Sequence, residues 1–317
     1  MDASPSTEPA PADVLGAAGV GVPFRCGPRE VTYADALESL ALRGAWSAVV
    51  EEVGGREAAL LAAEGRARSA LDAGIPALEQ ALRRRLRLTS ADDYVVWLGR
   101  WALTVDACRD HLRRQSVEPM TAGDAPAVAL RAHVVIEGVL DDAVRRLAQD
   151  AALAGADSGS TTWLADVVAA AEAARREDPV PSAVADLVAE HLVDWTRVDA
   201  TVVVAADDDV AHELLLCVRE QHTPLLAVAH GAGLAPTELA ATLDDVEDWL
   251  EPALVGAEPG ALLGPLAHPS GRAVVELIAR TVPDENDEVV RRRAREELLE
   301  RRAAVAMSQT IRWSAGA

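Results

Sequence analysis

The sequence contains no lysine, so all thirty of its basic residues are arginine. Aromatic residues make up only 3% of the chain, which has a single phenylalanine, whereas Ala, Val and Leu are abundant. Small and medium aliphatic side chains at this density favour packed helices over an all-β fold. We interpret the absence of lysine as a compositional bias without functional meaning.

Cysteine is also scarce. Cys26, Cys108 and Cys217 lie far apart and form no CxxC pair, which argues against a disulfide framework and favours small buried hydrophobes. No apolar run approaches the roughly 18 residues that cross a bilayer. The first 24 residues are acidic and lack the basic start and apolar core of a secretory signal. We therefore expect a cytoplasmic protein with no membrane partner.

Basic residues are also few compared with acidic ones, so the formal net charge is −21. A field of this sign repels phosphate backbones, so we expect no nucleic-acid partner and favour a neutral or cationic peptide. Between residues 201 and 258 there are twelve acidic residues and one basic residue, Arg219. This pattern predicts either a solvated acidic face or a surface for a basic peptide. Trp249 lies beside these acids, where a tryptophan suits peptide recognition or a core position.

Familiar catalytic motifs are missing as well: the chain has no GxxxxGK[ST], HExxH or GxSxG. Cys217, His222 and His230 lie close in sequence, with His212 nearby, but their spacing matches no standard zinc-ligand pattern. We interpret them as scattered histidines and expect no metal, no cofactor and no catalytic residue of these classes.

Helical patterning dominates up to about residue 195. It follows a Pro- and Ala-rich segment, 1–28, that reads as a flexible tail. Thr32, Ser90, Thr104 and Ser182 are the predicted helix starts. Gly54-Gly55 predicts a helix end, and Gly74 with Pro76 predicts a break.

From Val198 the pattern changes to a β-branched strand, then helices, then two strands around the turn Pro269-Ser270-Gly271. The segment 234–245 reads as a linker between helices. A helix over about 287–308 carries an apolar stripe, Val290, Ala294, Leu298 and Val305, that needs a partner. The segment QTIRW, at residues 309–313, reads as a short strand.

Three stretches now resemble one family. RRRLRLTSADDYVVWLGRWALTVDACRDHLRR (83–114) is similar to the helical N-domain of the SurA/PpiC-type foldases. Residues 188–231, with Ala211 and Glu213, resemble the first strand and helix of a parvulin domain. Residues 255–283, with Pro259, Gly260, Gly264, Pro265 and Gly271, resemble its ending. The resemblance covers about 32–313, and the similarity extends to PpiC-like proteins found beside enzymes that modify ribosomally made peptides.

The resemblance implies an α+β fold, mostly α. A SurA-N-like helical domain covers 29–195, a small degenerate parvulin-like α/β domain covers 196–283, and a long C-terminal helix, 284–317, packs on the helical domain. The family's catalytic histidines are absent: the first strand reads Asp199-Ala200-Thr201-Val202, and Ala273 stands at the second histidine position. The family's GGdLG segment is also missing, so its activity does not carry over.

We therefore predict a peptide-binding, chaperone-like accessory protein without prolyl isomerase activity. Its client would be an unfolded polypeptide or a ribosomally made precursor peptide, and a peptide-modifying enzyme is a candidate partner. The candidate peptide-contacting residues are Trp249, Leu226, Leu250 and Leu266. Three alternatives stay open: an active peptidyl-prolyl cis-trans isomerase, a peptide-modifying enzyme such as a cyclase component, and a structural subunit of a modification complex.

Overall fold

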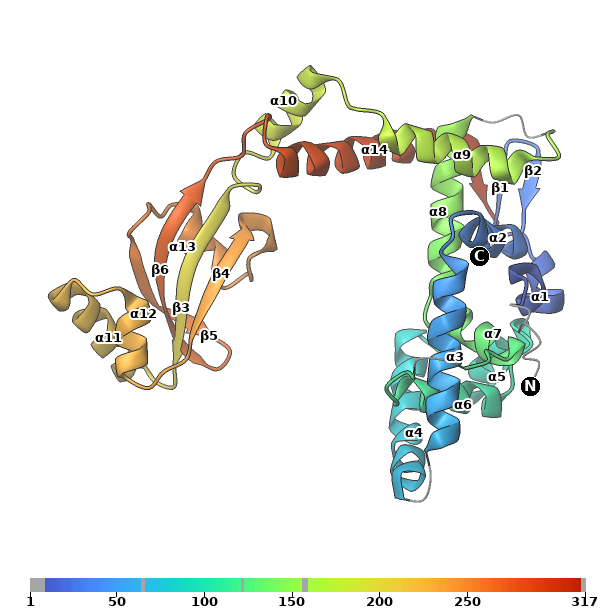
Figure 1. Ribbon diagram of the computed structural model, residues 1–317, viewed down its shortest axis with the longest axis horizontal. Coiled ribbons are helices and arrows are strands. Elements are labelled where there is room, and N and C mark those ends of the chain that lie inside the picture. Colours follow the sequence, from blue (N-terminus) through green and yellow to red (C-terminus); the bar gives the residue numbers. More distant parts are fainter. Residues whose placement is uncertain (1–8, 64–65, 121–122, 156–158, 315–317) are drawn as a thin grey trace, which may run out of the picture. The chain divides into compact units, whose positions relative to one another are not determined.

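The computed structural model describes residues 9–63, 66–120, 123–155 and 159–314. The chain divides into two compact units (Figure 1). We call the part up to Glu177 together with the part from Leu299 onward the helical unit, and Asp178–Leu298 the sheet unit. The domain boundaries expected from the sequence, at 195/196 and 283/284, stay a prediction. The observed division falls earlier in the chain and inside the C-terminal helix.

The helical unit contains α1 to α9 and a small three-stranded sheet. Its elements are α1 (Pro11–Leu15), η1 (Gly16–Val20), β1 (Phe24–Cys26), β2 (Arg29–Val31), α2 (Tyr33–Leu42), α3 (Trp46–Ala62), α4 (Arg66–Arg85), α5 (Ala91–Arg100), α6 (Val105–Gln115), α7 (Ala127–Ile136), α8 (Val139–Ala154), α9 (Trp163–Arg176) and β7 (Ile311–Trp313).

The sheet unit follows α9 in the chain. Its elements are α10 (Pro181–Glu190), β3 (Arg197–Ala205), α11 (Asp208–Gln221), α12 (Leu225–Gly231), β4 (Pro236–Thr242), η2 (Leu243–Asp245), α13 (Glu251–Val255), β5 (Leu262–His268) and β6 (Gly271–Thr281). The long helix α14 (Glu288–Thr310) begins in this unit and ends in the helical unit. The predicted class, α+β and mostly α, is confirmed, and the structure shows that both small sheets are antiparallel. Among helices in the described part of the chain, none combines the length and apolarity needed to cross a bilayer.

The segment predicted as a flexible tail is ordered wherever it is described. Residues 11–31 form α1, η1 and the β1–β2 hairpin, and Val14, Leu15 and Phe24 have no exposed surface. Strand β1 also pairs with β7, with Phe24 opposite Trp313. The Pro- and Ala-rich composition predicts a flexible tail, but burial of a few apolar side chains against the helical core overrides this tendency.

The glycine pair Gly54-Gly55 lies inside α3 and does not end it. A Cβ atom on Gly54 would lie 2.2 Å from the Gly123 carbonyl oxygen, and one on Gly55 would lie 2.4 Å from that of Met120. These glycines therefore allow another backbone segment to touch the helix, a use that the local sequence does not reveal. Helix α4 likewise continues through Gly74 and Pro76.

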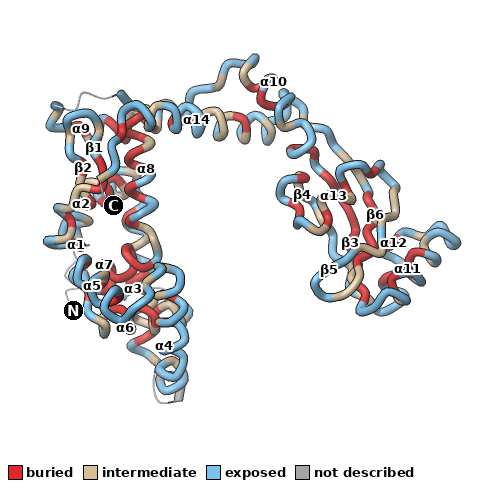
Figure 2. The backbone as a smooth tube through the Cα atoms, turned by 180° about the vertical axis from the view of Figure 1, so that it is seen from behind, coloured by how far each residue is buried: buried red, intermediate tan, exposed pale blue. Residues whose placement is uncertain are grey.

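The sheet of the sheet unit has the strand order β4-β3-β6-β5, all antiparallel. Figure 2 shows the central strands β3 and β6 as its most buried part. The segment predicted as a linker contains β4, which pairs with β3 from Pro236 to Thr242. Its proline, alanines and glutamate have low strand propensity, so pairing rather than local preference makes it a strand.

Helix α14 contributes to two separate cores. Val290, Ala294 and Leu298 pack with α10 and Trp195 in the sheet unit, whereas Ala306 and Met307 pack against the core of the helical unit. Val305, the fourth residue of the predicted stripe, is exposed. The stripe therefore changes partner along the helix instead of facing one surface. The short strand predicted after it is confirmed as β7.

Candidate functional site

Different segments pack against the two faces of the four-stranded sheet. Val203 and Ala205 of β3 face the helices α11 and α12. Alternate residues of the central strands form the opposite side, which we call the covered face: Val198, Ala200 and Val202 of β3, and Ala273, Val275 and Leu277 of β6. Residues 243–257 lie over this face, because Leu243, Val246, Leu250, Leu254 and Ala257 are buried in the same cluster.

Small apolar side chains line the covered face in the two strands where the sequence resemblance finds the family's histidines missing. Ala273, at the second histidine position of that resemblance, has no exposed surface, and Ala200, within the first-strand run Asp199-Ala200-Thr201-Val202, is almost fully buried in the same cluster. Neither methyl group can donate or accept a hydrogen bond or a proton. At these positions the covered face therefore offers shape and apolar surface, without polar groups that could act on a bound amide.

At one end of the covered face the cover is incomplete. Val204, Ala273 and Leu266 are opposite one another across β3, β6 and β5, and Val204 and Leu266 are half-buried. Trp249 packs against this cluster and is also half-buried. We call Val204, Leu266, Trp249 and His268 the tryptophan edge.

Trp249 is held by two neighbours. Its indole Nε1 donates to Glu247 Oε2 at 2.8 Å, and its ring meets the His268 ring edge-to-face at 5.0 Å between centroids. The His268 Nδ1 accepts the backbone N–H of Ser270 at 3.0 Å, which fixes the imidazole. A large aromatic side chain that is fixed and only half-buried on an apolar strip can anchor an incoming chain without losing further side-chain entropy.

The structure brings three of the four candidate residues together. Trp249 and Leu266 belong to the tryptophan edge, and Leu250 lies in the same cluster but is buried, with 3% of its surface exposed. Leu226 lies elsewhere, exposed on α12, because its neighbours Leu225 and Ala229 are the residues that face the opposite side of the sheet. His268 was not predicted, because a single histidine before a turn carries no recognisable pattern.

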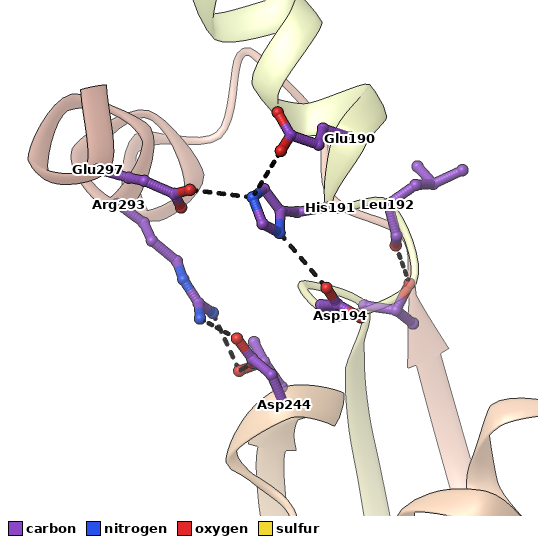
Figure 3. Close-up of polar contacts among 9 residues, drawn as sticks. Glu190, His191, Leu192, Asp194, Asp244, Arg293 and Glu297 are labelled. Atoms are coloured by element: carbon purple, nitrogen blue, oxygen red, sulfur yellow. Dashed lines mark hydrogen bonds and ion pairs between the residues drawn. The ribbon is translucent and has the colours of Figure 1, made fainter. Parts of the chain in front are cut away.

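Several acids of the 201–258 stretch have structural roles. Asp207 caps α11 by accepting from the Val210 N–H at 2.9 Å. Asp244 pairs with Arg293 of α14, and His191 Nε2 lies 3.0 Å from Glu297 Oε1 on the same helix (Figure 3). These contacts join α14 to the base of the sheet. The acids left beside the tryptophan edge are therefore fewer than the sequence count suggests.

No metal centre emerges from the histidines and cysteines. In the portion of the chain that the structure describes, no three His, Cys, Asp or Glu side chains converge in a way that could hold an ion. Cys217 is half-buried on α11, and His222 follows that helix with a left-handed backbone, φ 50°.

A second candidate surface, absent from the sequence prediction, lies in the helical unit. A pocket of about 290 Å³ opens between α4, α6 and the end of α7. Its lining combines five aliphatic residues with four polar ones, Arg85, Gln115, Ser116 and Glu137, which we call its polar side. The lining residues are Leu78, Ala81, Leu82, Arg85, Leu112, Gln115, Ser116, Ile136 and Glu137. They span almost sixty positions of the chain, so no local motif could have indicated them.

Two buried histidines support the polar side of this pocket. His111 Nε2 donates to Glu137 Oε1 at 2.7 Å, and this hydrogen bond lowers the pKa of Glu137. Gln115 donates to His133 Nδ1 at 3.4 Å, and burial lowers the pKa of His133. Glu137 is therefore a carboxylate at neutral pH, held in place from behind, while His133 is neutral.

This arrangement predicts acid sensitivity of the helical unit. Because the folded-state pKa of His133 is below its unfolded value of about 6.5, the unfolded chain takes up the proton first, and stability falls as pH drops below about 6.5. Below about 4.5, protonation of Glu137 adds to the loss. The free energy of unfolding cannot fall by more than about 1.4 kcal/mol per pH unit for each proton taken up.

Urea unfolding of the helical unit between pH 7 and pH 5 measures this effect. His133→Gln should flatten the dependence, because it removes the titrating ring. His212→Gln, a change at an exposed histidine of α11, should leave it as in the wild type. Equal slopes for wild type and His133→Gln would show that His133 is not responsible.

Comparison with known proteins gives similarity to solved structures only. No family model matches the chain, and no curated protein matches it. The peptidylprolyl isomerase PrsA from Bacillus cereus is 12% identical, with 92% of this chain and 89% of that chain covered and a TM-score of 0.30. PrsA from Bacillus subtilis is 11% identical, with coverages of 92% and 91% and a TM-score of 0.26.

A third similar structure comes from a study of PEB4 and the periplasmic protein Cj1289, described as SurA-like chaperones of Campylobacter jejuni. It is 10% identical, with 93% of this chain and 99% of that chain covered and a TM-score of 0.22. These three solved structures are thus described as peptidylprolyl isomerases of the PrsA type and SurA-like chaperones.

Proposed function

We propose that this protein binds unfolded polypeptide segments at the tryptophan edge and acts as a chaperone-like accessory protein. The observation that carries the proposal is Trp249, which is fixed by Glu247 and His268 and only half-buried on an apolar strip. Aromatic anchors on apolar surfaces dominate the binding energy of protein interfaces. The nearby carboxylates, among them Asp248, favour a neutral or basic segment.

The proposal includes the absence of prolyl isomerase activity. Ala273 stands where the sequence resemblance expects one histidine, and Ala200 belongs to the first-strand run that lacks the other. Neither residue adds a polar group to the covered face. A binding surface that treats the planar and the twisted amide alike does not lower the rotation barrier, which is about 18–20 kcal/mol. The proposed client is a ribosomally made precursor peptide, the proposed partner a peptide-modifying enzyme, and the proposed compartment the cytoplasm. All three extend the sequence resemblance.

Substitution of Trp249 tests the site. We expect Trp249→Ala to weaken binding of a fluorescein-labelled unfolded polypeptide by about 30-fold, because loss of an aromatic anchor costs about 2 kcal/mol. Fluorescence anisotropy measures the affinity. Leu226→Ala is the matched control: this leucine is exposed on α12, away from the tryptophan edge, and its loss should leave the affinity unchanged.

The circular dichroism melting curve must show that Trp249→Ala remains folded. Equal affinities for wild type and Trp249→Ala would disprove the site. A pull-down comparing a precursor peptide with its scrambled sequence tests the client, and equal capture of the two would remove it.

A prolyl isomerase is the second candidate, and one observation favours it: the His268 imidazole lies against Trp249 at the open end of the covered face. NMR exchange of an X-Pro peptide distinguishes the two functions. We expect the exchange rate to stay at its uncatalysed value when the protein is added. If the protein accelerated the exchange and His268→Ala abolished this acceleration, the function would be catalytic and the binding proposal would be wrong.

A further inference from the structure

The pocket of the helical unit is at the small end of the range for ligand sites. Such sites measure about 300–1,000 Å³, and this one measures about 290 Å³. Its size suits a single large amino-acid side chain. The walls agree with an apolar occupant, because Leu82, Leu112 and Ile136 are buried behind it and Leu78, 39% exposed, lies at the mouth.

The polar side of the pocket matches a peptide backbone. Arg85 Nη2 donates to the carbonyl of Ile136, and a guanidinium carries more N–H groups than this bond uses. Glu137 gives one oxygen to His111, and a carboxylate can accept further hydrogen bonds. A hydrogen-bond donor, Arg85, and an acceptor, Glu137, thus lie beside the aliphatic walls, and their opposite charges largely cancel.

The support behind Glu137 shows that this orientation is built into the fold. His111, which holds the carboxylate, is 1% exposed, and its ring meets that of His133 edge-to-face at 5.9 Å. A buried imidazole that holds an exposed carboxylate costs side-chain entropy and desolvation, and it leaves the acceptor preorganised at the pocket mouth.

We propose that this pocket receives one large aliphatic or aromatic side chain of an extended polypeptide, while Arg85 and Glu137 bind the C=O and N–H of the same residue. The proposal adds a second subsite to the proposed function and rests on it for the identity of the client. Because the charges at the mouth are balanced, the pocket selects by side-chain size and apolarity and not by charge.

The test uses a single capped residue, so that it reads the pocket without the rest of a client. The probe is N-acetyl-L-phenylalanine amide, and N-acetyl-L-alanine amide is its small counterpart. We expect ligand-observed NMR to give a dissociation constant on the order of 1 mM for the phenylalanine probe, and binding at least tenfold weaker for the alanine probe.

Filling the pocket should remove this binding. Ala81 lines the pocket from the exposed surface of α4, so Ala81→Trp should weaken the phenylalanine probe at least tenfold. Ala73→Trp, an equally exposed site on α4 outside the lining, should bind it as the wild type does. Leu78→Ser, which removes an apolar wall, should also weaken the probe and serves if Ala81→Trp does not fold.

Wild-type affinity in both Ala81→Trp and Leu78→Ser would overturn the proposal, as would the absence of probe binding to the wild type at millimolar concentration. Failure here leaves the Trp249→Ala result untouched. Conversely, a protein that binds the capped phenylalanine but no unfolded polypeptide would retain the pocket and lose the proposed function.

Discussion

Replacing Asp150 by alanine should destabilise the helical unit by about 3–5 kcal/mol, the cost of breaking a buried ion pair on one side. Asp150 lies on α8 with no exposed surface. One carboxylate oxygen binds Arg43, which follows α2, and the other binds Arg175 of α9. A single carboxylate thus pairs with two mostly buried guanidinium groups and links three helices.

The arginines explain the size of the effect. Burial lowers the pKa of Arg43, and Asp150 acts in the opposite direction. The Arg43 Nε and Nη1 atoms are already buried without a hydrogen-bond partner. Without Asp150, the mostly buried charge on Arg43 would lose its ion-pair partner while keeping little access to water, which is the costly situation for a buried ion.

Urea unfolding followed by circular dichroism measures the loss. Asp142→Ala is the matched control on the same helix, because Asp142 forms an exposed pair with Arg145, and exposed pairs contribute at most about 1 kcal/mol. If Asp150→Ala were as stable as Asp142→Ala, the buried carboxylate would be dispensable and the three-helix link would not exist.

Features decided within a few residues could be predicted from the sequence. Thr32, Ser90 and Thr104 are N-caps whose hydroxyls accept a backbone N–H three residues later. The β-branched run around Val202 is the central strand β3. Ser182 is an exception, because α10 begins with Pro181 after Val180, and a proline in the first turn starts a helix as well as a hydroxyl does.

Features decided by distant contacts could not be predicted. Strand β4 exists because β3 pairs with it, and the segment around Phe24 is ordered because β7, at the other end of the chain, pairs with β1. The same limit applies to the sites. Trp249 was recognisable beside its acids, but its contact with His268 depends on a sheet register that the sequence does not state.

The glycine pair of α3 looks like a local helix end, but contact with the distant backbone around Gly123 explains it. For this reason we expect a Gly→Ala substitution here to lower the stability instead of raising it. Replacing a helical glycine by alanine normally stabilises by about 0.5–1 kcal/mol. At Gly54 the new Cβ would lie 2.2 Å from the carbonyl oxygen of Gly123 and 3.0 Å from its carbon. We therefore expect Gly54→Ala to destabilise the helical unit by about 3 kcal/mol, the upper end of overpacking.

The obstacle is backbone, so no side-chain rotation relieves the clash. The approach is mutual, because a Cβ on Gly123 would lie 2.1 Å from the Gly54 carbonyl oxygen, and the N–H of Met120 donates to the carbonyl of Gly55 at 3.0 Å. Gly74→Ala is the control: it lies inside α4 with open space around it, and it should stabilise by about 0.5–1 kcal/mol. Urea unfolding of the two variants should thus give shifts of opposite sign. A stabilised Gly54→Ala would mean that this backbone segment does not rest on α3.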